Sequence, residues 1–218
     1  VQLGERHRLV LRNIYNESSL DAFSRQATGT NRVFALTGHN FTRTETANSL
    51  AAQVFSTLGN GALNEFTVGY TTTRFKRDPA VLAPMITVQN VGGANNAQLR
   101  AGTENSSQGN FLNENLLEIS NNFTRPLGDR HTLTLGTRNE FYEVENGFLQ
   151  NSYGNYTFAS LAALAAGTPS LYSGSGSLGG DPVARFTAGQ FAVYGQDEFR
   201  VTDRLAVTAG LRLDLPYF

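Results

Sequence analysis

Apolar and polar residues alternate along residues 190–214, QFAVYGQDEFRVTDRLAVTAGLRLD. In the second half of this stretch, one face of an extended strand carries Leu205, Val207, Ala209, Leu211 and Leu213, and the other carries Arg204, Thr208, Gly210, Arg212 and Asp214. The first half repeats the pattern, and about two or three residues around Thr202 and Asp203 join the halves. Alternation over roughly ten residues per arm is what a transmembrane β-strand needs to cross a bilayer at a tilt. The stretch therefore predicts a membrane-spanning hairpin.

The same periodicity predicts about seven strands along the chain. Ascending strands are expected to begin at about Arg6, Leu63, Arg130 and Arg204, and descending strands to end near Leu58, Thr124 and Val201. Asn60-Gly61 is the strongest short hairpin signal among the tight turns. Long polar loops are expected at residues 17–32, 78–109 and 147–184. Tight turns on one side and long loops on the other are typical of an up-and-down barrel.

Three segments depart from the simple alternation of long strands and polar loops. Residues 33–43, VFALTGHNFTR, are either an extra strand or the upper part of the next strand, and the requirement that all tight turns share one side favours the second interpretation. Residues 85–89, MITVQ, predict a short strand inside the second long loop. In the third loop, FASLAALAAG predicts a short helix that starts near Ser160 and stops at Gly167.

Composition limits the class of protein. Charged residues make up 16% of the 218 residues, aromatic residues 11%, and the net charge is −1, so we expect no nucleic-acid partner, which would favour a basic face. Cysteine is absent, which excludes disulfides and cysteine-based zinc sites. No apolar run has the length of a transmembrane helix, and the charges within residues 1–11 are unlike a signal peptide. We expect residues 1–218 to be a partial β-barrel domain without a plug domain or a signal peptide.

Candidate chemistry is sparse. His7 and His131 occupy the same position in two ascending strands, but those strands are not neighbours in a meander, so we expect polar residues at the barrel rim rather than a metal site. No Ser-His-Asp arrangement or GxSxG in a strand-to-helix context occurs. We therefore predict a protein that is not an enzyme and needs no cofactor.

The polar side of the predicted strands is the candidate site. Its charged members, expected to face the lumen and a plug, are Arg8, Arg12, Glu118, Arg138, Glu140, Glu198, Arg200, Arg212 and Asp214. Such charges either solvate a channel and pair across strands, or contact a plug or a solute. Gly69, Gly136 and Gly210 are expected on the same side, where a missing side chain permits close approach. Asp197 interrupts the apolar side, which is tolerable at the periplasmic rim or if a bulge turns the residue inward.

Several segments resemble the TonB-dependent outer-membrane receptors, specifically their large Oar-like branch. The matching stretches are GERHRLVLR from Gly4, NEFTVGYTTTRFKRDP from Asn64, GDRHTLTLGTRNEFYEVENGF from Gly128, SYGNYTFASLAALAAGTP from Ser152, and FAVYGQDEFRVTDRLAVTAGLRLDLP from Phe191. The resemblance implies a bacterial outer-membrane barrel of about 22 strands closed by a plug. It also implies loops that capture a solute, whose identity the loops do not reveal, and a TonB-type energy transducer acting on the parent protein from the periplasm.

The resulting prediction is an all-β, antiparallel, up-and-down transmembrane β-barrel segment of about seven strands, with a short helix in one extracellular loop. Its expected partners are outer-membrane lipid, the plug domain of the same parent chain, the TonB-type transducer and an unknown solute. A passive porin, a structural or adhesin-like outer-membrane barrel, and a soluble β-domain are the alternatives.

Overall fold

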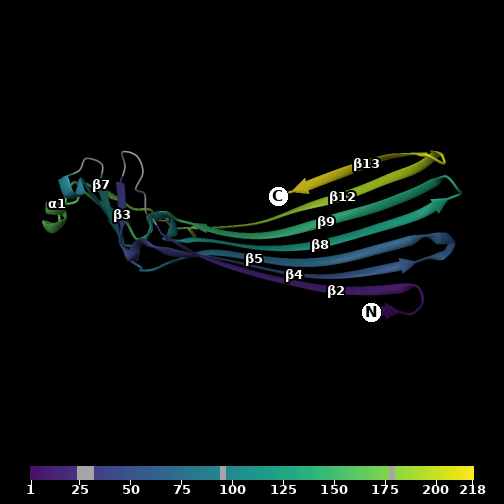
Figure 1. The fold of residues 1–218 in the computed structure, drawn as a ribbon, viewed down its shortest axis with the longest axis horizontal. Coiled ribbons are helices and arrows are strands. Elements are labelled where there is room, and N and C mark those ends of the chain that lie inside the picture. Colours follow the sequence, from purple (N-terminus) through teal and green to yellow (C-terminus); the bar gives the residue numbers. More distant parts are fainter. Residues whose placement is uncertain (24–31, 94–96, 177–179) are drawn as a thin grey trace.

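The computed structural model describes residues 1–23, 32–93, 97–176 and 180–218. Within these ranges the chain is almost entirely β, and no described helix is long and apolar enough to span a membrane. A long antiparallel sheet carries its tight turns at one end, called here the turn end, and a small second sheet lies beyond its other end (Figure 1).

The long sheet has eight described strands, and it is not closed on itself. In spatial order they are β1 (Gln2–Leu3), β2 (His7–Ala22), β4 (Phe41–Thr57), β5 (Leu63–Pro79), β8 (Asn110–Leu127), β9 (His131–Phe148), β12 (Val183–Thr202) and β13 (Leu205–Tyr217). The seven long strands begin or end within about three residues of the predicted positions at the turn end. The eighth, β1, is a two-residue strand that pairs with β2 and was not predicted.

Turn chemistry explains why the turn end was predictable. Asn60 and Gly61 both adopt positive φ, 58° and 70°, in a 3₁₀ turn (Gly59–Gly61) that joins β4 to β5. The similar sequences at Gly4 and Gly128 begin two further turns with positive φ, 75° and 66°. Glycine adopts this conformation without steric cost, so each of these sequences reverses the chain sharply.

Two predictions at the other end are wrong. Most of residues 33–43 is not the upper part of the next strand: β3 (Arg32–Ala35) is separate and is followed by a 3₁₀ turn (Thr37–His39), and only residues 41–43 belong to β4, which begins at Phe41. Because β3 pairs with β7 in the second sheet, it does not disturb the up-and-down order of the long one. The predicted loop at residues 17–32 starts too early, since β2 reaches Ala22. The other two loops, predicted at 78–109 and 147–184, agree with the ends of the long strands to within about two residues.

The loops fold together rather than forming separate polar connections. Their five described strands form the second sheet, in the spatial order β11 (Leu171–Ser173), β10 (Asn155–Phe158), β6 (Met85–Gln89), β7 (Ala97–Ala101) and β3. The predicted strand at residues 85–89 is confirmed as β6, and the predicted helix as α1 (Leu161–Ala165), with the Ser160 side chain capping its first turn and Gly167 at a φ of +66° after it. Two more 3₁₀ turns occur at Val91–Gly93 and Asn105–Ser107. We call the second sheet, α1 and their connections the loop cap.

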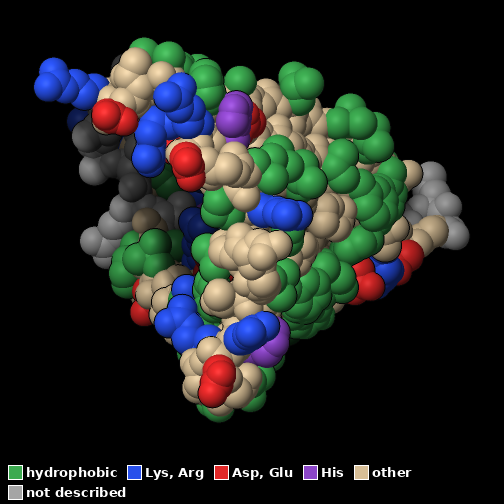
Figure 2. Space-filling view, turned by 90° about the vertical axis from the view of Figure 1, so that its right-hand side faces the viewer, with side chains coloured by type: hydrophobic (Ala, Val, Ile, Leu, Met, Phe, Trp, Pro, Cys, Tyr) green, Lys and Arg blue, Asp and Glu red, His purple; other side chains and the backbone are tan. Residues whose placement is uncertain are grey.

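Aromatic rings border the apolar face of the long sheet. Hydrophobic side chains cover this flank when the molecule is viewed along the strands from the turn end (Figure 2). Towards the loop cap, Phe141 lies 5.6 Å from Phe191, which lies 5.5 Å from Tyr217. Towards the turn end, the His131 ring stacks on Phe199 at 4.5 Å. From His131 to Phe141 a tilted strand rises roughly 25 Å, which matches the apolar band of a transmembrane barrel between its aromatic girdles.

Asp197 stays on the apolar face. The pairing of β12 with β9 is continuous across it, and the register shift in β12 comes only between Arg200 and Thr202. A bulge therefore does not turn this residue to the polar side. Its carboxylate instead contacts the His131 Nδ1 atom at 2.6 Å, near the turn end. A hydrogen-bonding partner at the edge of the apolar band makes the polar residue tolerable there.

Candidate functional site: the polar face and the loop cap

Strand register places all nine predicted charged residues on one face of the long sheet, called the polar face. One row across the sheet runs Arg8, Phe55, Glu65, Asn122, Gly136, Tyr194 and Arg212. A parallel row runs Arg12, Ala51, Gly69, Glu118, Glu140, Gln190 and Pro216. Arg138 and Asp214 flank Ala192 in the row between them, and Glu198 and Arg200 follow on β12 in the direction of the turn end.

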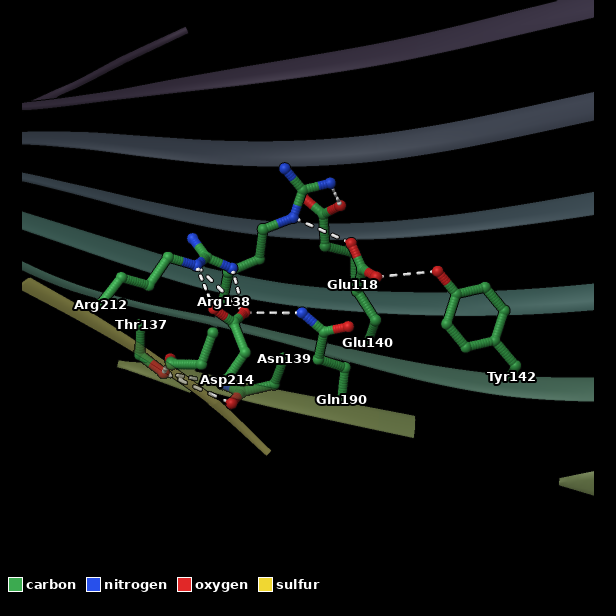
Figure 3. Close-up of polar contacts among 10 residues, drawn as sticks. Glu118, Thr137, Arg138, Asn139, Glu140, Tyr142, Gln190, Arg212 and Asp214 are labelled. Carbon is green, nitrogen blue, oxygen red and sulfur yellow. Dashed lines mark hydrogen bonds and ion pairs between the residues drawn. The ribbon is translucent and has the colours of Figure 1, made fainter. Parts of the chain in front are cut away.

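Arg138 bridges two carboxylates at the centre of this face. Its Nη2 atom lies 2.7 Å from Glu118 Oε2 and its Nε atom lies 2.9 Å from Glu140 Oε1. Glu118 and Glu140 are directly opposite each other on β8 and β9, so the guanidinium separates two like charges that would otherwise repel. Tyr142 donates its hydroxyl to Glu140 at 2.8 Å and extends the cluster towards the loop cap (Figure 3).

A second cluster lies on β12 and β13. Arg212 donates from Nε to both oxygens of Asp214, at 3.0 and 2.9 Å, and from Nη2 to Oδ1 at 2.8 Å. Gln190 donates to the same carboxylate at 2.6 Å, so the Asp214 side chain is fixed by neighbours on two strands (Figure 3). In both clusters the charged side chains pair with residues on the same strand or on the adjacent strand of the long sheet.

Tyr194 ties four strands together through a glycine. Its ring lies over Gly136 of β9, and its hydroxyl donates to the Asn122 side chain of β8. The Arg212 guanidinium of β13 lies 5.5 Å from the centre of the same ring. A tyrosine can cross a neighbouring strand in this way only where that strand presents no side chain, which is the role of Gly136.

Sequence reasoning missed the uncharged members of these clusters, which are Asn122, Tyr142, Gln190 and Tyr194. Their positions have the parity of the polar face, and that signal was present in the sequence. Which residues touch depends on register between strands, and no motif encodes it.

The remaining predicted charges lie apart from these clusters. Arg8 covers the Phe55 ring at 4.8 Å. Glu198 and Arg200 form no ion pair among the described residues. Arg12 borders a hollow of about 320 Å³ together with Glu65 and Glu118. Several of the residues that line this hollow are small, which leaves room for a side chain of another segment: Ser49, Ala51, Gly69, Thr71 and Ser120.

The loop cap has a buried core of its own. Met85, Val88 and Phe158 are buried in it. Polar residues are buried as well: the Gln108 side chain, 2% exposed, donates to the Thr103 carbonyl at 3.2 Å and accepts from the Tyr153 backbone N–H at 2.7 Å. Because Gln108 and Tyr153 belong to the second and third loops, this network joins the two loops into one body.

His39 joins the first loop to this core. It is completely buried, and its Nδ1 atom donates to the Gly102 carbonyl at 3.1 Å while Nε2 has no partner among the described residues. Burial lowers the pKa of the His39 imidazole below its usual value, and the nearby Arg100 charge acts in the same direction. The ring is therefore neutral at neutral pH.

The described residues contain no group of three or more His, Asp or Glu side chains placed to hold a metal ion. His7 and His131 lie on β2 and β9, which are separated in the sheet by β4, β5 and β8, so the rings are roughly 19 Å apart or more.

Comparison with known proteins gives two findings. A family model described as an outer membrane beta barrel domain matches residues 1–217. Among solved structures, the outer membrane transporter YddB from Escherichia coli is similar, with a TM-score of 0.65 and 13% sequence identity over 98% of this chain and 26% of YddB. The chain thus spans about a quarter of that transporter, and at this identity the likeness concerns the fold alone. No curated protein sequence matches the chain.

Proposed function

Because the chain belongs to the family of outer membrane β-barrel domains, and so lies in the bacterial outer membrane, we propose that it is part of the barrel wall of a TonB-dependent receptor of the Oar-like branch. In this role the apolar face seals against lipid, the polar face lines the lumen against a plug domain, and the loop cap contacts the solute outside the cell. The segment itself is neither an enzyme nor a cofactor-binding domain. The plug and the sites for the TonB-type transducer belong to the parent protein.

The observation that carries this proposal is the lateral pairing of charges on the polar face of an unclosed sheet. A barrel of about eight strands closes around side chains that fill its interior. Here the eight described strands leave two free edges, and Arg138 and Arg212 pair with carboxylates on their own or the adjacent strand. This arrangement suits a wide lumen, and a wide lumen leaks unless a plug fills it.

A photo-crosslinking amino acid at position 138 of the parent protein tests the plug. The expected product is an internal crosslink between the β9 wall and a segment of the parent chain outside residues 1–218. In planar bilayers the purified parent protein should conduct almost no ions in its resting state. Steady conductance together with the absence of any internal crosslink would support the passive porin instead.

A soluble β-domain is the remaining alternative from another class. A lipid-attached quencher should quench a fluorophore placed at Leu211, because this side chain is 87% exposed on the apolar face. A soluble domain would show no quenching.

A further inference from the structure

The apolar face becomes polar immediately beyond the aromatic border that faces the loop cap. On β8, Asn115 and Asn113 follow Leu117, and on β9, Glu143 and Glu145 follow Phe141. Unbroken register keeps these side chains on the same face as the lipid-facing residues. We call this set the outer collar: Arg74, Lys76, Asn113, Asn115, Glu143, Glu145 and Arg185.

The outer collar is hollowed. A cavity of about 520 Å³ is bordered by polar side chains from β5, β8, β9 and β12, among them Arg74, Asn115, Glu143 and Arg185. A second cavity of about 190 Å³ lies against β4 and β5 and shares Arg74 and Asn113 with the first. The two cavities adjoin at Arg74 and Asn113, and we call them together the groove; its lining residues come from β4, β5, β8, β9 and β12, and its polar collar residues lie on the same face as the lipid-facing residues.

The polar side chains of the groove are held in place by the protein. Arg74 donates to the carbonyls of Thr73 and Glu114, each at 2.8 Å, and to Asn115 Oδ1 at 2.6 Å. A guanidinium has five N–H groups, so within the described part of the chain two of those on Arg74 are left over. On the far side, Arg185 is fixed by Glu145 at 2.8 Å and by Asp181.

The acceptors are equally ordered. Asn115 donates to Glu143 Oε2 at 3.1 Å, and Asn113 donates to Glu145 Oε2 at 2.8 Å. Each carboxylate accepts through several lone pairs, so capacity for further hydrogen bonds is left. The collar has three cations, Arg74, Lys76 and Arg185, and two anions, Glu143 and Glu145. Asp78 pairs with Lys76 at 2.7 Å, so the net positive charge of the collar and its immediate surroundings is lowered further. The groove therefore offers the unused N–H groups of Arg74 to phosphate or hydroxyl oxygens and the carboxylates of Glu143 and Glu145 to hydroxyl donors, a combination that suits a phosphorylated, hydroxyl-rich saccharide.

We propose that this groove binds the saccharide headgroup of a glycolipid of the outer leaflet, of the lipopolysaccharide type. The groove faces the lipid side, and it begins where the aromatic border ends, which is the level of the headgroups. Sugar hydroxyls donate to Glu143 and Glu145 and accept from Arg74 and Arg185. The proposal rests on membrane insertion and not on the transport role, so it stands or fails independently of the plug.

Lipid retention by the parent protein tests the proposal. The protein, extracted from outer membranes in mild detergent, should carry lipopolysaccharide in native mass spectra. The double variant Glu143→Ala, Arg185→Ala should bind added lipopolysaccharide at least about tenfold more weakly, because hydrogen bonds to charged groups are lost. Glu114→Gln is the control, since the side chain of residue 114 lies on β8 at the same height but on the polar face. The substitution leaves in place the backbone carbonyl that accepts from Arg74, so this variant should bind like the wild type.

Folding is verified by heat-modifiable migration in gels, and if the double variant does not fold, the isosteric Glu143→Gln takes its place. Wild-type protein without bound lipopolysaccharide, or equal binding by collar variant and control, would overturn the proposal. Delipidated polysaccharide separates the two sources of sugar. Binding of the free polysaccharide as tight as that of the intact glycolipid would also overturn it, because the groove would then serve a soluble ligand.

Discussion

Replacing Gly136 by alanine should displace the Tyr194 ring from its place on the polar face. A Cβ atom at this position would lie 2.5 Å from Cε2 and from the hydroxyl oxygen of Tyr194, and closer still to Cζ. Carbon atoms in contact are separated by about 3.5 to 4.0 Å. The tyrosine ring must therefore leave its place by more than about 1 Å, which breaks its hydrogen bond to Asn122 and its contact with Arg212.

The magnitude follows from these contacts. A neutral hydrogen bond contributes about 1 kcal/mol net, and an exposed cation–π contact about 0.5 to 1 kcal/mol. Displacing the packed ring removes about 1 kcal/mol of apolar contact as well. Gly136→Ala should thus lower the free energy of unfolding by about 2 to 3 kcal/mol. In a Tyr194→Ala background the same change should cost almost nothing, which gives a coupling of about 2 kcal/mol in a double-mutant cycle.

Gly69→Ala is the matched control. Gly69 lies on the same face, but the nearest atom to a new Cβ, Glu118 Cβ, is 3.9 Å away, an ordinary contact. This change should alter stability by no more than about 0.5 kcal/mol, with a stabilising contribution from the less flexible unfolded chain. Urea unfolding of the parent protein in lipid vesicles, followed by heat-modifiable migration in gels, measures both. Equal costs for Gly136→Ala and Gly69→Ala would refute the reasoning.

Four further outcomes are expected. Arg138→Met should destabilise the parent barrel in urea by about 0.5 to 1 kcal/mol, because Glu118 and Glu140 then face each other unscreened, whereas Arg200→Met, which removes no ion pair, should be neutral. Burial depresses the His39 pKa, so as the pH falls the imidazole is protonated in the unfolded cap before it is protonated in the folded cap. The free energy of unfolding of the cap is therefore constant above the ordinary pKa of 6.5. Below that pH it decreases by at most about 1.4 kcal/mol per pH unit. The protection factors of loop-cap amides, which are corrected for the intrinsic exchange rate at each pH, should fall from pH 7.5 to 5.5, and His39→Gln but not His7→Gln should remove this dependence. Gly102→Ala should disrupt the cap and its exchange protection, since φ is +73° and a Cβ would lie 2.9 Å from the Pro84 carbonyl carbon. Expressed alone, residues 1–218 should aggregate or require detergent, because both edges of the sheet lack partners; a stable monomer in plain buffer would contradict a membrane barrel.

The sequence by itself determined the faces of the long strands and the ends of those strands at the turns. Side chains alternate with a period of two, so the parity of Arg138 or Leu211 assigns each to its face without knowledge of any neighbour. The turns at Asn60 and Gly128 could likewise be predicted from the local sequence, because Asn and Gly favour the positive φ that such turns require. All nine predicted charges share one face for this reason.

Only the tertiary structure decided what those side chains touch and how the loops fold. Tyr194 reaches Asn122 because register brings Gly136 between them, and register between separate hairpins is a property of the whole sheet. In the loop cap, β3 pairs in parallel with β7 and β10 pairs in parallel with β6, so strands of four or five residues meet across long stretches of chain. The pattern of apolar and polar residues in such short segments does not predict which strand each one pairs with. The segments are ordered by a shared buried core around Val88, Phe158 and His39, which forms only when the loops pack together.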